Sequence, residues 1–225
     1  PGQSLSSAGN LGVFALLVVI SYWAGWKWSS SSNEFEGRPY WILGISSLLA
    51  ISVFITDPVV NPGIGVMLVI STGLFFLFSS WYGKLIWLPL ISLWGLAALP
   101  FSPAAGTWMV RSGMSWLPVL FILPAQSLLV SGFIHHVLHP GGGLHALRER
   151  WTRILNGTAL GLLFLIMILL GLWGWVGAGM LGNWWASVIV IILTASFILL
   201  RSRKITRTQR DFFSRQKVGS RVVLN

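Results

Sequence analysis

The four histidines of the chain lie in one short stretch: His135, His136, His139 and His145. His135 and His139 are four residues apart and His136 and His139 are three apart, so each pair shares one face of a helix. Such a pair can hold Zn²⁺, another transition metal or a haem iron, and imidazoles also relay protons near neutral pH. The alternative to metal binding and proton relay is a structural role, in which the histidines solvate a helix end and contact acidic lipid head groups.

Several kinds of catalysis are excluded by the residue types. The five carboxylates all lie outside the middle of the apolar segments, which argues against paired-carboxylate chemistry and against a proton pump that uses a buried Asp or Glu. Cysteine is absent, so there is neither a thiolate metal site nor a cysteine nucleophile. Ser115 and the histidines lie at opposite ends of one apolar segment, which excludes a serine protease, and a single histidine cluster excludes a di-iron desaturase. Enzyme activity therefore stays open: the expectation is none for the chain on its own, with a subunit of a redox-driven, proton-translocating complex as the alternative.

The composition indicates a membrane protein. Of 225 residues, 55% are hydrophobic and 9% charged, and the mean hydropathy is +0.77. Soluble domains carry about 25% charged residues. Lipid leaves only helices and closed barrels as spanning structures, and the alternating strands of a barrel are missing. The prediction is an all-α, polytopic bundle in a membrane, which we place in a prokaryotic plasma membrane.

Seven apolar segments are candidate spans, since about 20 apolar residues cross the hydrocarbon core. They cover residues 11–26, 40–56, 63–80, 85–99, 114–138, 154–176 and 183–200. A flexible, solvated loop is expected at 29–37, where four serines precede Asn33. The chain then divides into a transmembrane domain at 1–200 and a basic tail at 201–225. Because the chain begins at Pro1, we expect either a processed start or a piece of a longer protein.

The basic residues give the topology. With seven spans, all 15 Lys and Arg residues except Arg111 fall on one side, which the positive-inside rule makes cytoplasmic. The N-terminus is then outside and the C-terminus inside. Most of the 14 tryptophans lie near predicted span ends, as an interfacial belt requires, and Trp94 is left in the middle of a span.

The tail should bind anionic lipid head groups, each basic residue contributing about 1 kcal/mol. Its candidate lipid-binding residues are Arg201, Arg203, Lys204, Arg207, Arg210, Arg215 and Lys217. Docking of a protein partner is the alternative, and nucleic-acid binding is not expected beside a membrane.

One segment carries a resemblance to a known family. The sequence Leu88-Pro-Leu-Ile-Ser-Leu-Trp-Gly-Leu-Ala-Ala-Leu-Pro100-Phe-Ser-Pro-Ala-Ala-Gly106 resembles the Leu-Ser-Leu-Ala-Gly-Leu-Pro-x-x-x-Gly segment of the antiporter-like membrane subunits. These subunits belong to NADH-quinone oxidoreductase (complex I) and related membrane hydrogenases. The resemblance covers about residues 40–200. It implies a helix bundle that conducts protons within a larger complex, and a chain that is the later part of a longer one.

In the family that the segment resembles, coupling uses a buried Lys or Glu on the span after the proline motif. The 114–138 segment has neither, and the seven-span topology places the motif outside, whereas the family has it on the cytoplasmic side. The candidate proton path therefore consists of Gln126, Ser131, His135, His136 and His139, with Lys84 at its mouth. Gln126 and Ser131 follow Pro124, and their alternative role is to satisfy backbone groups that this proline frees.

Three functions remain open at this point. The leading hypothesis is a proton-conducting subunit without a cofactor of its own, assembled with other membrane subunits. The second is a non-catalytic scaffold or assembly protein whose tail binds lipid or a partner. The third is a membrane enzyme acting on lipid or sugar, with a metal on His135, His136 and His139.

Overall fold

The part of the protein that the structure describes is mostly helical, with short turns and no strand. The computed structural model describes residues 8–55, 93–99, 102, 108, 115–138, 154, 158–159, 161–162, 165–166, 169 and 184–201. Its long helices are α1 (Ala8–Ser30), α2 (Glu34–Ile55), α5 (Leu117–Leu138) and the helix Trp184–Arg201. Each is long and apolar enough to cross a membrane. The predicted all-α, multi-pass membrane architecture is thus confirmed.

Four of the seven predicted spans correspond to these helices: 11–26, 40–56, 114–138 and 183–200. The predicted span at 63–80 lies outside the described residues. Those at 85–99 and 154–176 are described only in part, and the tail beyond Arg201 is not described.

The connection between α1 and α2 is shorter than the sequence predicts. Instead of a loop over 29–37, only Ser31, Ser32 and Asn33 separate the two helices. The serines continue α1 because their hydroxyls donate to its last carbonyls, as Ser30 does to Trp26 O at 2.8 Å and Ser31 to Trp28 O at 2.7 Å. The Asn33 carbonyl then accepts the first helical bond of α2, from Gly37 N at 3.1 Å, and acidic residues in the first turn suit the helix dipole.

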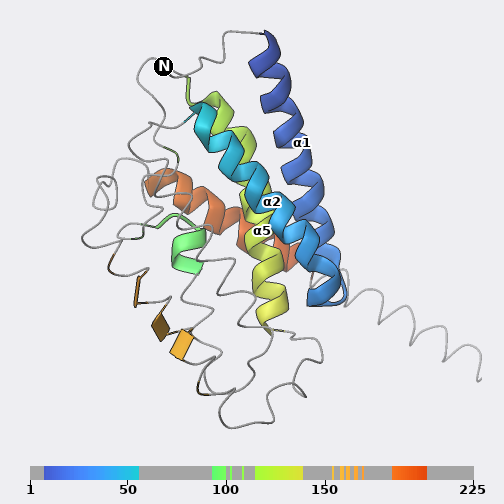
Figure 1. The fold of residues 1–225 in the computed structure, drawn as a ribbon, viewed down its shortest axis with the longest axis vertical. Coiled ribbons are helices and arrows are strands. Elements are labelled where there is room, and N and C mark those ends of the chain that lie inside the picture. Colours follow the sequence, from blue (N-terminus) through green and yellow to red (C-terminus); the bar gives the residue numbers. More distant parts are fainter. Residues whose placement is uncertain are drawn as a thin grey trace, which may run out of the picture.

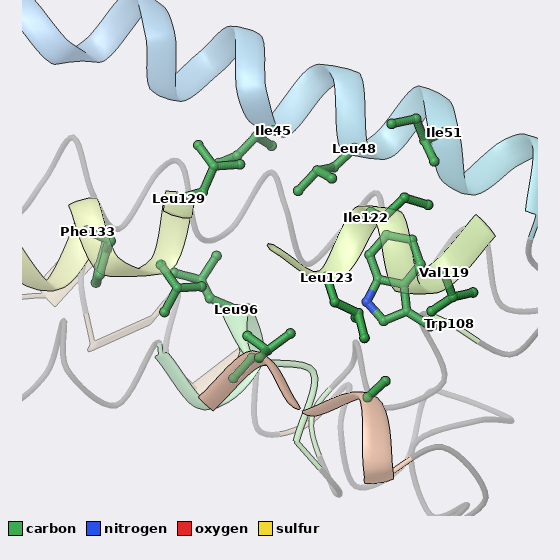
Figure 2. Close-up of a cluster of buried hydrophobic side chains, with 14 of the residues drawn as sticks. Ile45, Leu48, Ile51, Leu96, Trp108, Val119, Ile122, Leu123, Leu129 and Phe133 are labelled. Atoms are coloured by element: carbon green, nitrogen blue, oxygen red, sulfur yellow. The ribbon is translucent and has the colours of Figure 1, made fainter. Parts of the chain in front are cut away.

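Helix α5 occupies the centre of the bundle. Figure 1 shows α1 and α2 lying along α5, with the Trp184–Arg201 helix crossing it obliquely. Figure 2 shows Ile45, Leu48 and Ile51 of α2 facing Ile122 and Leu129 of α5. Leu96 packs on the other side of α5 in the same cluster. This central position explains why α5 is the most buried of the candidate spans.

The contacts also give the helix directions. Tyr22, in the second half of α1, donates to Phe121 O at 2.7 Å, and Ser31, just past the C-terminal end of α1, bonds His136 at 3.0 Å. Positions along α1 and α5 therefore rise together, so the two helices run in the same direction. The three-residue turn makes α2 run the opposite way.

Glycines allow the helices to approach closely. A Cβ atom on Gly44 of α2 would lie 2.7 Å from a methyl group of Leu129, and one on Gly25 of α1 would lie 3.0 Å from the Leu128 Cβ. A Cβ on Gly132 of α5 would overlap the indole ring of Trp28. Small residues at contacts are the usual means of helix association in lipid, where the hydrophobic effect does not drive helices together.

The tryptophans divide into two groups, which corrects the prediction of a single interfacial belt. Trp23, Trp26, Trp116 and Trp184 are about half exposed, as belt residues would be, and so is Trp94. Trp28, Trp41 and Trp108 are buried in the bundle instead. The Trp28 indole N–H donates to Leu129 O at 3.1 Å, which compensates its removal from water.

Candidate functional site

The first group of buried polar residues surrounds the middle of α5. We call it the mid-helix cluster: Leu96, Ala98, Trp108, Gln126, Ser127 and Ser187. The Gln126 side chain is at its centre, since its amide nitrogen donates to Leu96 O at 2.7 Å and its amide oxygen accepts from Trp108 Nε1 at 2.8 Å. Both bonds are buried, where each is worth more than in water.

A helix ends inside the bundle at this cluster. Residues 93–96 form a helical turn, and Ala98 then adopts a left-handed conformation with φ of 55°. Ending a helix leaves its last carbonyls without partners, which is costly in lipid. Here the Leu96 carbonyl accepts from Gln126, and the Ala98 carbonyl accepts from the Ser187 hydroxyl at 2.6 Å. Two other helices therefore supply the donors that this irregular backbone needs.

Ser127 connects α5 to the helix Trp184–Arg201. Its hydroxyl bonds its own helix at Leu123 O, 2.7 Å, and lies 3.3 Å from Val190 O. In return, the Thr194 hydroxyl lies 3.4 Å from Ser127 O. The mid-helix cluster thus joins three segments by buried hydrogen bonds.

The second group lies where α1, α5 and Trp184–Arg201 end together. We call it the helix-end cluster: Trp28, Ser29, Ser31, His135, His136 and Arg201. His136 is buried, and its Nε2 lies 3.0 Å from Ser31 Oγ and 3.2 Å from Trp28 O. Its ring also packs on the Trp28 indole, with the ring centroids 4.2 Å apart. His136 therefore closes the end of α1 against α5.

Arg201 joins the third helix to this cluster. Its guanidinium donates to Ser29 O, one of the last carbonyls of α1, and lies 3.1 Å from His135 Nε2. A cation at the C-terminal end of a helix also interacts favourably with the helix dipole. The described part of the chain has three Lys or Arg residues, Lys27, Arg38 and Arg201, and all lie at this end of the bundle.

An ion pair between a buried carboxylate and a partly buried guanidinium lies in the first turn of α2, where the sequence predicts a solvated loop. Glu34 is 1% exposed, and its Oε1 accepts from Arg38 Nη2 at 2.7 Å and from Arg38 Nε at 2.9 Å. Arg38 also covers the Phe35 ring, 4.3 Å from its centroid. The i,i+4 spacing of Glu34 and Arg38 is the sequence signal that predicts this pair once the helix is known to begin at Glu34.

The predicted path residues fall into different places. Gln126 lies in the mid-helix cluster and His135 and His136 in the helix-end cluster, ten residues further along α5, or about 15 Å. Ser131 lies between them on α5 and donates to Leu128 O of its own helix at 2.9 Å. Lys84, His139 and the tail residues from Arg203 onward lie outside the described residues. The structure thus brings His135 and His136 together, with ring centroids 5.2 Å apart, and leaves Gln126 separate.

Within the described residues, no three His, Cys, Asp or Glu side chains are grouped as metal ligands. The Nε2 atom of His135 faces the Arg201 guanidinium, whose charge disfavours a cation at that nitrogen.

The fold and its buried polar clusters define an integral, multi-pass helical membrane protein. The chain matches no protein-family model, no curated protein and no solved structure.

Proposed function

We propose that the protein is a proton-conducting, antiporter-like membrane subunit that works within a larger complex. The observation that carries the proposal is the helix end at Ala98, deep in the bundle, with its carbonyls bonded by Gln126 and Ser187. In membrane transporters, broken helices near the bilayer midplane are where ions and substrates bind. Irregular backbone at this depth is tolerated where protein surrounds it or water lines it.

The arrangement of the described helices supports the seven-span topology that this proposal uses. The helix Trp184–Arg201 runs in the same direction as α5, since Val190 lies near Ser127 and Arg201 near His135. With α2 opposite to α5, an even number of spans belongs between them, as spans 63–80 and 85–99 provide. Lys27, Arg38 and Arg201 at one end agree with a cytoplasmic side there.

In this proposal the protons pass from Gln126 past Ser131 to the histidines, with Lys84 at the mouth. Gln126 has no titratable group, so its role is to orient water. Imidazoles exchange protons near neutral pH, so His135, His136 and His139 are the residues that carry charge. The two clusters are about 15 Å apart along α5, and Ser131 is the one proposed path residue between them. Water therefore has to connect the clusters.

Proton flux into liposomes tests the proposal. The protein is purified gently with the subunits that accompany it, reconstituted, and assayed with an internal pH dye under a potassium diffusion potential. We expect flux well above that of empty liposomes, and at least a ten-fold lower flux in a His135/His136/His139 triple alanine variant and in Gln126→Leu. Ser196→Ala is the matched control, because the Ser196 hydroxyl is exposed and bonds only its own helix.

Flux equal to that of empty liposomes would reject proton conduction. Normal flux in the triple alanine variant would remove the histidines from the path. Size-exclusion chromatography and thermal unfolding of every variant separate loss of conduction from loss of folding, which matters because His136 also closes the end of α1.

A scaffold or assembly protein is the second candidate, and the helix-end cluster favours it. His135 and His136 bond Arg201, Ser31 and the Trp28 carbonyl, and these contacts hold three helices together without requiring transport. Co-purification of partners together with absent flux would favour this function. The geometry of His135, whose Nε2 faces Arg201, does not favour a metal enzyme. A metal assay on the same sample tests for bound metal.

A further inference from the structure

A cavity of about 480 Å³ opens on the side of α5 that faces the helix Trp184–Arg201. Segment 93–99 forms its third wall. Its floor is buried and consists of Ala97, Val130 and Val190, while its rim is exposed at Trp94, Ile191 and Ile198. The lining is almost wholly apolar, and the Thr194 hydroxyl in it lies 3.4 Å from Ser127 O. The cavity therefore opens toward the surroundings of the bundle and accepts a hydrocarbon.

The dimensions of the cavity match one leaflet of a bilayer. From Val190 to Ile198 its wall follows eight residues of helix, or about 12 Å. Half of a hydrocarbon core is about 15 Å thick. Arg201 lies three residues beyond Ile198, on the same side of the helix and about one turn away. The cavity thus extends from near the middle of the bilayer to the level of the head groups.

Positive charge lies at the head-group end. The Arg201 guanidinium donates to Ser29 O and contacts His135 Nε2, and a guanidinium has five N–H groups. Further donors therefore remain for a phosphate, which Arg binds with charge-assisted bonds. The exposed Lys27 in the last turn of α1 adds a second positive charge at this end.

We propose that this cavity is a specific phospholipid site. One acyl chain of an anionic phospholipid occupies the cavity, and its phosphate binds Arg201. The acyl-chain cavity is separate from Gln126 and His136, neither of which lines it, and the two proposed sites meet where Arg201 contacts His135.

Native mass spectrometry tests the site. The full chain is reconstituted with equal amounts of phosphatidylglycerol and phosphatidylcholine that carry the same acyl chains, then transferred to detergent. We expect one retained phosphatidylglycerol per protein. Arg201→Gln should lower the preference for phosphatidylglycerol about five-fold, the effect of about 1 kcal/mol per basic residue. Ala195→Phe, which places a ring in the cavity, should abolish retention of both lipids.

Two control variants distinguish lipid binding in the cavity from non-specific attraction of lipid to positive charge or apolar surface. Arg111→Gln removes the same charge from the predicted outer side, and Ala15→Phe adds the same ring on the exposed face of α1. Both should retain the lipid as the original chain does. If Ala195→Phe fails to fold, Ile198→Trp narrows the rim and should also abolish retention.

Three results would overturn the proposal: equal effects of Arg201→Gln and Arg111→Gln, unchanged retention in a folded cavity-filling variant, or equal retention of phosphatidylcholine and phosphatidylglycerol by the original chain. The assay uses no proton gradient, so its outcome does not depend on whether the protein conducts protons.

Discussion

Ala98 has an unusual backbone conformation for a residue with a side chain. Its φ of 55° places it in the left-handed region, which costs an L-residue about 1–2 kcal/mol and costs glycine almost nothing. The conformation turns the Ala98 carbonyl to Ser187 and the Leu96 carbonyl to Gln126. The strained residue thus lies where two carbonyls accept hydrogen bonds from other helices.

Substitution of Ala98 by glycine should relieve this strain. We expect Ala98→Gly to raise the free energy of unfolding by about 1 kcal/mol, less the small loss of a buried methyl group. The neighbouring Ala97→Gly should instead lower it by about 0.5–1 kcal/mol, since glycine has no strain to relieve there. Thermal unfolding in detergent compares the two, and equal effects would show that Ala98 is not strained.

Among individual residues, the sequence predicts some members of the buried clusters and misses others. Gln126 stands out because it is an amide in an apolar helix, and the structure buries it with hydrogen bonds to Leu96 O and Trp108. Glu34 and Trp28 read as a loop residue and a belt residue. Their burial depends on Arg38 and on Leu129 O, and the latter lies a hundred residues away in a helix whose packing the local sequence does not encode.

At the scale of helices, the contact of α1 with α5 depends on Gly132. A Cβ at this position would overlap the Trp28 indole, which is itself fully buried and cannot move aside. Gly132→Ala should therefore lower the free energy of unfolding by about 1–3 kcal/mol. The matched control is Gly12→Ala, because nothing lies within 4 Å of a Cβ at Gly12, and it should raise the free energy of unfolding by about 0.5–1 kcal/mol through the helix propensity of alanine.

Unfolding in detergent with increasing sodium dodecyl sulfate measures both variants. Similar stabilities of Gly132→Ala and Gly12→Ala would mean that α1 and α5 do not pack closely at Trp28.

The existence of the helices is more predictable than their ends. Hydropathy alone predicts four of them, because about 20 apolar residues have no stable alternative in lipid. The composition of the serines after Trp28 is typical of a loop. Serine hydroxyls also bond helix carbonyls, and the balance between these two preferences decides where α1 ends. The choice of neighbours depends on glycine positions on three helices and does not follow from hydropathy.

For the molecule as a whole, the absence of cysteine makes topology directly measurable. Asn33 lies in the turn between α1 and α2, and Ser115 precedes α5 at the opposite end of the bundle. We expect a membrane-impermeant maleimide to label Ser115→Cys in intact cells, and Asn33→Cys only after permeabilisation. This follows from the basic residues near Asn33.

The opposite pattern of labelling would reverse the orientation, and labelling of both positions from one side would contradict a membrane crossing between them. Asn10→Cys, near the start of α1, is a second outer position that checks the result.

The burial of Trp28 against α5 also sets an order of events during synthesis. A ribosome that adds about 5–20 residues per second needs on the order of 4–17 s to extend the chain from Ile55 to Leu138. During that interval the α1–α2 hairpin is complete, but the indole N–H of Trp28 lacks its acceptor on Leu129. At the helix end this N–H can bond water or head groups until Leu129 arrives, so the contact of α1 with α5 forms only after α5 has inserted.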